Sequence, residues 1–248
     1  MSNFNKYSEY YDLLYGDKDY SFESEYLYKH MSSDKELKSL LELGCGSGGH
    51  AEFFSKKGID ITGIDMSSSM IEIAKNKKIS NFNPIVGDIT NFSFDKKFDS
   101  IISLFHVISY LNDDDSLLKC FQLAYDHLNF NGHFIFDFWY TPNIEFHKPE
   151  IRIKRKENNE MSIVRIAEPE ILSSKNIVKV NFDIFIIDKS KEEISNLKEV
   201  HPMRHFQIEE LKNIAKSVGF DFVLAEEFLT SKIPSNNSNG VLIKFIKK

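Results

Sequence analysis

The sequence has little of several features that mark other classes of protein. It holds only two cysteines, Cys45 and Cys120, in 248 residues, which indicates neither a disulfide framework nor a metal cluster. No apolar run approaches the roughly 20 residues that cross a bilayer, and the opening MSNFNKYSEYYD lacks the apolar core of a signal peptide. We therefore expect a soluble protein of the reducing cytoplasm, with no membrane association.

An excess of basic charge is also missing. The formal net charge is −6 at pH 7, whereas binding of nucleic acid by general electrostatics needs a basic face. Internal repeats and low-complexity tracts are absent from the sequence as well. A chain of this length can bury a full hydrophobic core. We expect one continuous domain without a nucleic-acid partner.

What the chain does have is a glycine-rich loop after an apolar run. The stretch LLELGCGSGGH, residues 40–50, places an acidic residue and four glycines directly before a helix-like segment. A backbone that turns tightly against a ligand has no room for side chains and often needs positive φ, which favours glycine. Gly44, Gly46 and Gly49 also fit the dinucleotide pattern G-x-G-x-x-G, which is a weak signal alone. A tight turn without a ligand is the alternative.

Two acidic residues end the next apolar runs. Asp65 closes IDITGID nineteen residues after Gly46, where a carboxylate at a strand tip can accept hydrogen bonds from ribose hydroxyls. Asp88 ends IVGDI, where it can accept a hydrogen bond from an adenine amino group. Singly, each has helix capping or turn formation as an alternative role. Together with the glycine loop, they predict a nucleoside site.

The remaining patterns predict alternating strands and helices. Strand-like runs lie at 59–64, 84–86, 98–104 and 133–139, with helix signals at 50–57, 67–76 and 113–128 between them. This alternation predicts an α/β fold with a mainly parallel sheet, whose strand tips share one edge. A helix over 208–218 and an antiparallel strand pair around 222–228 and 241–246 complete it.

We accordingly divide the single domain, residues 1–248, into four regions. A helical, Tyr-rich N-terminal cap (1–36), with one or two helices over Tyr7 to Tyr28, precedes a nucleoside-binding core (37–140). An antiparallel β insertion (150–202) is followed by the C-terminal completion of the core (203–248). The strand edges of the insertion can pair across a two-fold axis, so a homodimer is expected.

Glycine, acidic and acidic residues at successive strand tips resemble the class I S-adenosylmethionine-dependent methyltransferases. The resemblance implies a Rossmann-like fold that binds S-adenosyl-L-methionine, with Asp65 on the ribose and Asp88 on the adenine. Glu42 also suits a cofactor with an ammonium and a sulfonium better than a pyrophosphate, which disfavours a nicotinamide-dependent oxidoreductase. The implied cofactor contacts are Glu42, Gly44, Cys45, Gly46, Asp65, Met66, Asp88, Ile89 and Leu104.

A closer resemblance spans nearly the whole chain. The motifs YYDLLYGDKDY, SLFHVISYL, DFWYTPN and HPMRHF, in this order around the glycine loop and insertion, are similar to bacterial methyltransferases that N-methylate nucleotide-linked amino sugars. The chain departs from that branch at His106, where a small residue is expected, and around Asp137, where an acidic-Pro-Trp-Trp pattern is closer. O-methylation of a sugar or other small metabolite, and a non-catalytic nucleoside-binding subunit, are the alternatives.

Candidate catalytic residues lie near the strand tips. A sulfonium is already an activated methyl donor, so the protein must position a neutral nucleophile and let a proton leave. His106 and Tyr110, which would share one face if their segment were helical, are candidate bases. Tyr11 in the N-terminal cap is a third candidate near the methyl group. Structural hydrogen bonding or aromatic packing is the alternative for each.

Three further residues are candidate substrate contacts. Trp139 and Tyr140 end the fifth strand, where a flat ring can form a wall for a sugar or base, with core packing as the alternative. Arg204 has no acidic partner nearby in the sequence and is expected to grip a phosphate or carboxylate, with a surface ion pair as the alternative. No metal site is predicted, since His201 and His205 lack an acidic partner at metal-ligand spacing.

Overall fold

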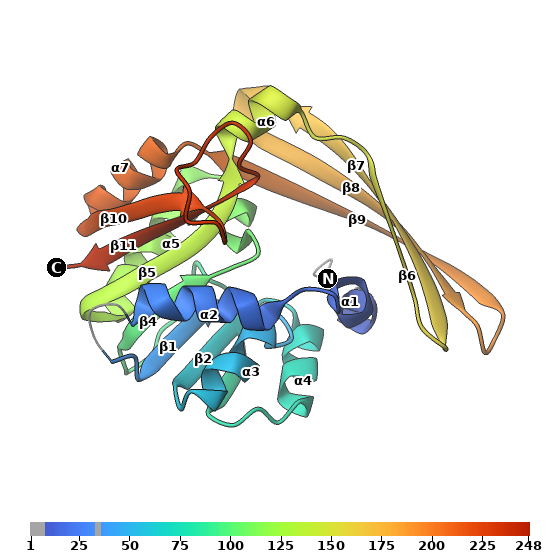
Figure 1. Cartoon of the computed structure of the whole chain (residues 1–248), viewed down its shortest axis with the longest axis horizontal. Helices are drawn as coiled ribbons and strands as arrows, with labels where there is room; N and C mark the ends of the chain where they lie inside the picture. Colours follow the sequence, from blue (N-terminus) through green and yellow to red (C-terminus); the bar gives the residue numbers. More distant parts are fainter. Residues whose placement is uncertain (1–7, 33–35) are drawn as a thin grey trace.

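Helices cover both faces of a central sheet, and a long antiparallel arm extends from one side of it (Figure 1). The computed structural model describes residues 8–32 and 36–248. Residues 1–7, including Tyr7, and residues 33–35 of the predicted N-terminal cap lie outside the described residues. Within the described part, no helix combines the length and apolarity that crossing a membrane requires.

The central sheet is mainly parallel, as predicted. Its parallel strands lie in the order β3-β2-β1-β4-β5, and an antiparallel pair, β10 and β11, extends it beyond β5. Their bounds are β1 Ser39–Leu43, β2 Asp60–Asp65, β3 Phe82–Val86, β4 Phe98–Ser103, β5 Leu128–Tyr140, β10 Phe220–Glu227 and β11 Gly240–Lys247. The parallel pairing brings the carboxyl ends of β1 to β5 to one edge, where open α/β sheets bind ligands.

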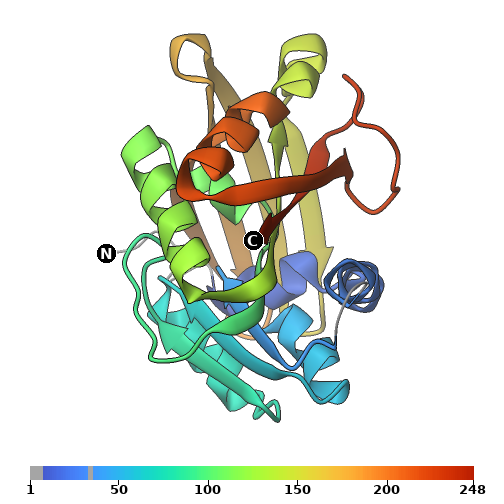
Figure 2. The ribbon, with the colours of Figure 1, turned by 90° about the vertical axis from the view of Figure 1, so that its left-hand side faces the viewer.

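Alternate residues of the strands pack on opposite layers of helices. Leu40 and Ile102 face a buried cluster with α2 (Tyr20–Met31) and α3 (Gly49–Lys56). Their neighbours Leu41 and Ile101 belong to a second cluster with α5 (Asp114–His127) and α7 (Ile208–Val218), which lie beside each other in Figure 2. Because successive side chains of a strand point to opposite faces, continuous apolar runs produce a sheet buried on both sides.

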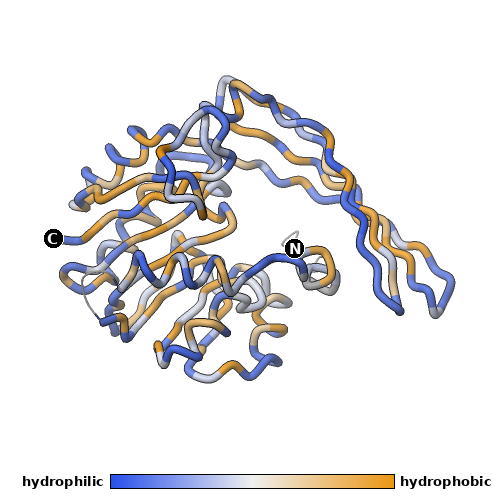
Figure 3. The backbone as a smooth tube through the Cα atoms, viewed as in Figure 1, coloured by the Kyte–Doolittle hydropathy of each residue, from blue (hydrophilic) through white to orange (hydrophobic). Residues whose placement is uncertain are grey.

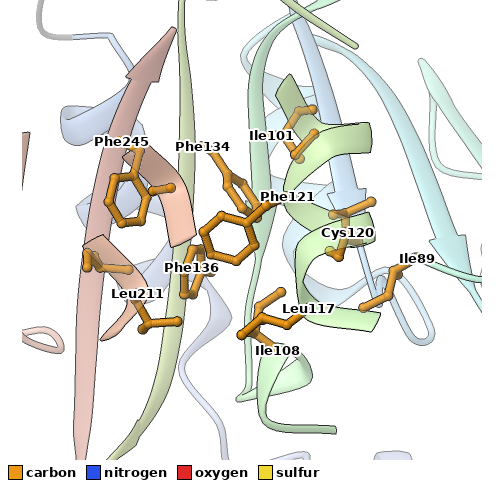
Figure 4. Close-up of a cluster of buried hydrophobic side chains, with 14 of the residues drawn as sticks. Ile89, Ile101, Ile108, Leu117, Cys120, Phe121, Phe134, Phe136, Leu211 and Phe245 are labelled. Carbon is orange, nitrogen blue, oxygen red and sulfur yellow. The ribbon is translucent and has the colours of Figure 1, made fainter. Parts of the chain in front are cut away.

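An aromatic group fills the core beneath α5. The Phe121 ring lies 5.3 Å from that of Phe134 and 5.5 Å from that of Phe136, both in edge-on geometry, as Figure 4 shows. All three side chains are fully buried, and each contributes about 1.5–3 kcal/mol of apolar burial. On the edge side of the core, α4 (Ser68–Asn76) packs on β2 and β3, capped by Ser67, whose hydroxyl accepts the Met70 N–H.

The inserted segment forms the arm. It consists of four antiparallel strands, β6 (Arg152–Glu157), β7 (Met161–Leu172), β8 (Ile177–Asp188) and β9 (Glu193–Phe206). β9 meets β5 in a short parallel pairing at Trp139 and Tyr140, next to α6 (Thr141–His147). The first helix, α1 (Ser8–Tyr15), packs against the arm through Leu14, which joins Ile163 and Ile184 in a small apolar cluster. Figure 3 shows the alternation of hydrophobic and hydrophilic residues along these strands.

Candidate active site

A cavity of about 1050 Å³ lies at the carboxyl ends of the parallel strands and is lined by residues of the core, α1, α6 and the arm. It includes all nine predicted cofactor contacts, Glu42, Gly44, Cys45, Gly46, Asp65, Met66, Asp88, Ile89 and Leu104. Its volume is just above the roughly 300–1,000 Å³ that is usual for one small ligand. The cavity therefore has room for a second ligand beside a nucleoside.

The glycine loop is held by the neighbouring strand. The N–H groups of Gly44 and Cys45 donate to the Ile64 carbonyl at 2.7 and 3.0 Å. Gly44 has φ +77°, and a Cβ there would lie 2.5 Å from a methyl carbon of Val107. Gly46 has φ +51°, yet no atom of the described chain lies within 4 Å of its would-be Cβ. The protein thus needs the first glycine for its own packing, whereas the second opens onto the cavity.

The two acidic strand tips are oriented by nearby backbone. Asp65 accepts the Gly46 N–H through Oδ2 and the Ser67 N–H through Oδ1, both at 2.9 Å. Burial raises the pKa of Asp65, against the effect of these hydrogen bonds. Asp88 accepts both the N–H and the hydroxyl of Thr90 through Oδ1, at 2.7 and 2.8 Å. Each carboxylate retains lone pairs that can accept hydroxyl or amino donors from a nucleoside.

Glu42 belongs to a buried chain of charged side chains that the sequence did not reveal. Its Oε1 lies 3.0 Å from Nδ1 of His50, whose Nε2 lies 3.0 Å from Glu23 in α2. Burial alone would lower the pKa of His50, but hydrogen bonds to both carboxylates outweigh it and raise that pKa. Oε2 of Glu42 is buried and has no hydrogen-bond partner in the part of the chain described. A buried carboxylate oxygen beside the glycine loop fits a ligand ammonium.

His106 is paired with a buried carboxylate. Its Nδ1 lies 2.8 Å from Oδ2 of Asp137, and its backbone N–H donates to Oδ1 of the same residue at 3.0 Å. The Asp137 side chain is 1% exposed, and that of His106 is 27% exposed and lines the cavity. Burial would raise the pKa of Asp137, but the attraction and hydrogen bonds of His106 outweigh it and lower that pKa. This geometry orients the imidazole in the way a general base requires.

The segment after β4 is not the helix on which the shared face of His106 and Tyr110 depended. Phe105 and His106 have φ of +64° and +62°, and the 3-10 helix η1 (Val107–Tyr110) follows. Left-handed non-glycine residues cost about 1–3 kcal/mol each and cluster at functional sites. Both predicted bases line the cavity, but Tyr110 bonds to His201 of the arm rather than to the His106 pair.

Tyr11 and Trp139 also line the cavity, from segments far apart in the sequence. Tyr11 lies in α1, with its ring 4.7 Å from that of Tyr15. Trp139 ends β5, with its ring 6.2 Å from the imidazole of His106. Tyr140 is not among the lining residues; its ring packs edge-on against Phe138, in the core cluster. Because neighbours on a strand face opposite ways, only one of the two final aromatic residues of β5 can face the cavity.

Arg204 is not placed as expected. Its guanidinium bonds to Asp114 at 2.7 Å and to Glu210 at 2.6 Å, and it is not among the residues that line the cavity. Both acids are distant enough in sequence, or separated by a turn, to have escaped sequence reasoning. The lysines and arginines that do line the cavity, three of them in or beside the arm, are Lys18, Lys148, Arg152 and Arg165. No group of three or more metal-ligating side chains occurs among the described residues.

This fold, with a glycine loop and two acids around one cavity, defines a class I S-adenosylmethionine-dependent methyltransferase domain. In agreement, residues 40–132 match the family model described as a methyltransferase domain. The chain thus carries such a domain, and S-adenosylmethionine is the cofactor that its site fits. The buried, unpartnered oxygen of Glu42 and the open face of Gly46 are the features of this chain that fit the cofactor.

Relatives and solved structures agree with this class. The chain is 30% identical, over 139 residues, to the dTDP-3-amino-3,4,6-trideoxy-alpha-D-glucopyranose N,N-dimethyltransferase of Streptomyces venezuelae. That match covers 55% of this chain and spans only 58% of the relative's length. An S-adenosylmethionine-dependent methyltransferase from Clostridium acetobutylicum has the same fold, with TM-score 0.84, 22% identity and 98% of each chain covered. Streptomyces venezuelae DesVI matches with TM-score 0.81, 20% identity and 98% of each chain covered.

Proposed function

We propose that the chain transfers a methyl group from S-adenosylmethionine to the amino nitrogen of a nucleotide-linked amino sugar. The observation that carries the proposal is the His106–Asp137 pair, which faces the same cavity as the nucleoside-binding strand tips. A domain that only senses a nucleoside has no use for a histidine oriented by a fully buried carboxylate, which costs stability to bury. The similarity to an amino-sugar N,N-dimethyltransferase supports the same substrate class.

Bound S-adenosylmethionine supplies an activated methyl group, so this chain's residues need only bind, orient and deprotonate the acceptor. In the proposed site Glu42 accepts hydrogen bonds from the amino group of the cofactor, Asp65 binds the ribose, and Asp88 reads the adenine. The imidazole of His106 takes the proton that the acceptor nitrogen must lose. Asp137 then stabilises the resulting imidazolium, which is the arrangement that general-base histidines share.

The arm side of the cavity suits a nucleotide. Arg152 and Arg165 come from β6 and β7, and Lys148 follows α6, so positive charge gathers away from the glycine loop. A diphosphate between nucleoside and sugar would meet these cations, since guanidinium groups recognise phosphate oxygens through paired donors. Arg165 also bonds to the hydroxyl of Tyr15 at 2.5 Å, which fixes its position beside α1. We therefore assign the phosphate contact expected of Arg204 to these residues.

A paired-substrate assay tests the proposal. The protein is incubated with S-adenosylmethionine and either a dTDP-linked amino sugar or the same nucleotide sugar with a hydroxyl in place of the amine. The proposal predicts that mass spectrometry finds one or two added methyl groups on the amino compound and none on the hydroxy compound. Methylation of the hydroxy compound would point to an O-methyltransferase. Absence of both products, with S-adenosylhomocysteine still bound, would leave a nucleoside-binding subunit.

Two expectations about the whole protein stay predictions. The outer strand of the arm is β6, where Ile151 and Ile153 beside and within it are exposed, and pairing of such edges is one route to the expected homodimer. Size-exclusion chromatography with light scattering distinguishes a dimer from a monomer. The cytoplasmic location is likewise still a prediction.

A further inference from the structure

A second buried hydrogen-bond chain joins the arm to the core, and the function proposed above does not use it. The hydroxyl of Tyr110 in η1 lies 2.9 Å from Nδ1 of His201 in β9, and Nε2 of His201 lies 3.0 Å from Glu199. The side chains of His201 and Glu199 are 3% and 1% exposed. Tyr110 and His201 both line the cavity, so one end of the chain is accessible to a ligand.

The chemistry of the three groups fixes the direction of the hydrogen bonds. An ionised carboxylate can only accept, so Nε2 of His201 must carry the proton that faces Glu199. A neutral imidazole with its proton on Nε2 has an acceptor at Nδ1, and the Tyr110 hydroxyl must therefore donate its only proton there. Any further hydrogen bond at the Tyr110 oxygen is then one that this oxygen accepts. Burial raises the pKa of Tyr110 well above its usual value, which keeps the phenol protonated.

We propose that Glu199 and His201 act as positioning residues that make the Tyr110 hydroxyl an acceptor, so that it selects an N–H donor on the acceptor substrate. This inference rests on the proposed function and adds a determinant of its specificity. An amine offers the hydrogen that Tyr110 can accept. A carbonyl or ether at the same place offers none and would leave two acceptors facing each other, which costs binding free energy.

A purely structural role is the competing explanation, because the same bonds also tie η1 to β9. The two explanations differ in what happens when the polarity is reversed without loss of volume. In Glu199→Gln, the amide can donate to Nε2 of His201, which favours the tautomer with the proton on Nδ1. That proton then points to the Tyr110 oxygen, and the Tyr110 hydroxyl must turn its own proton elsewhere.

The tautomer of His201 is measurable without any substrate. Long-range ¹H–¹⁵N correlation NMR distinguishes the two neutral tautomers, and the His201→Gln variant identifies the resonances. We expect the Nε2–H tautomer in the wild type and a shift toward Nδ1–H in Glu199→Gln. The Nδ1–H tautomer in the wild type would overturn the inference. This result is independent of whether the sugar substrate is the right one.

Kinetics of the double-mutant cycle then test the specificity role. Glu199→Gln is expected to raise KM for the amino sugar about 5- to 100-fold, the usual consequence of a mismatched buried hydrogen bond. The exposed Glu193→Gln on the same strand is the matched control and should change nothing. In a Tyr110→Phe background, Glu199→Gln should have no further effect on KM, with binding of S-adenosylhomocysteine unchanged throughout.

The outcomes separate the two proposals. If Glu199→Gln raises KM by the same factor with and without the Tyr110→Phe change, the role of Glu199 is structural and the inference is overturned. No methylation of any amino sugar, together with the Nε2–H tautomer, would refute the proposed function while the hydrogen-bond polarity stands.

Discussion

Replacing Asp137 by Asn should reduce catalysis without preventing cofactor binding. The amide keeps an oxygen that can accept the His106 backbone N–H, which Asp137 holds at 3.0 Å, and it keeps the side-chain volume in a fully buried place. It loses the negative charge 2.8 Å from Nδ1 of His106, so the imidazolium that forms when His106 takes a proton is no longer stabilised.

The size of the effect follows from that one contact. A hydrogen bond to a charged group contributes about 1.5–3 kcal/mol, and each 1.4 kcal/mol is a factor of ten in rate. We therefore expect kcat to fall about 10- to 150-fold. The pH profile should change as well, since an imidazolium without its carboxylate partner forms less readily and the acid limb of kcat moves to lower pH.

Steady-state methyl transfer to an amino sugar, measured by mass spectrometry between about pH 5 and 9, where a histidine titrates, is the assay. Titration calorimetry with S-adenosylhomocysteine is the control, and its Kd should match that of the wild type. If kcat and its pH profile are unchanged in Asp137→Asn, His106 is not the base and the reasoning fails. If S-adenosylhomocysteine no longer binds, the carboxylate serves to hold the strand tips and not to assist proton transfer.

Three further predictions concern the glycine loop, acid stability and the corrected arginine. Gly46→Ala should weaken binding of S-adenosylhomocysteine at least about tenfold while unfolding shows a loss of only about 1 kcal/mol, whereas Gly44→Ala, whose Cβ would clash with a neighbouring side chain, should lose more stability; equal binding by both variants would contradict this. Burial would raise the pKa of Asp99, but hydrogen bonds from Asn129 and from the backbone outweigh it and lower that pKa below 3.8. The contribution of Asp99 is thus present above pH 3.8 and lost as the pH falls through the lower folded value. Asp99→Ala should therefore cost about 1 kcal/mol near neutral pH, after allowance for solvent, and less below about pH 3; a pH-independent difference in urea unfolding would refute it. Arg204→Ala should leave KM for the nucleotide sugar unchanged and reduce stability by at most about 1 kcal/mol; a large rise in KM would restore its substrate role.

The sequence predicted those parts of the fold that local patterns specify. The helix predicted over 208–218 coincides with α7, since Gln207 and Glu210 form a capping box at its start and Gly219, with φ +112°, ends it. The cofactor side of the site was also predictable. Glycines and acids at strand tips reach one cavity whenever parallel strands place their carboxyl ends together, and all nine predicted contacts line it.

Contacts between distant segments could not be predicted. Asp137 is 31 positions from His106, and Glu23 is 27 positions from His50, so no local pattern reveals either pair. Arg204 was expected to lack a partner, because one of its acids lies 90 positions away and the other six positions along, across the start of α7. The backbone after β4 was likewise unpredictable, because two consecutive non-glycine residues in the left-handed region are stabilised only by tertiary contacts such as the bond to Asp137.

The central claim, that the strand tips of this cavity hold the nucleoside of the cofactor, is tested most directly by titration calorimetry with S-adenosylhomocysteine. The wild type should bind it, and Asp65→Ala should weaken binding by about 1–3 kcal/mol, or roughly 5- to 150-fold, because a charged acceptor for the ribose hydroxyls is lost. Reduced nicotinamide dinucleotides should not bind. An unchanged Kd in Asp65→Ala, or tight binding of a nicotinamide dinucleotide in place of S-adenosylhomocysteine, would contradict the account.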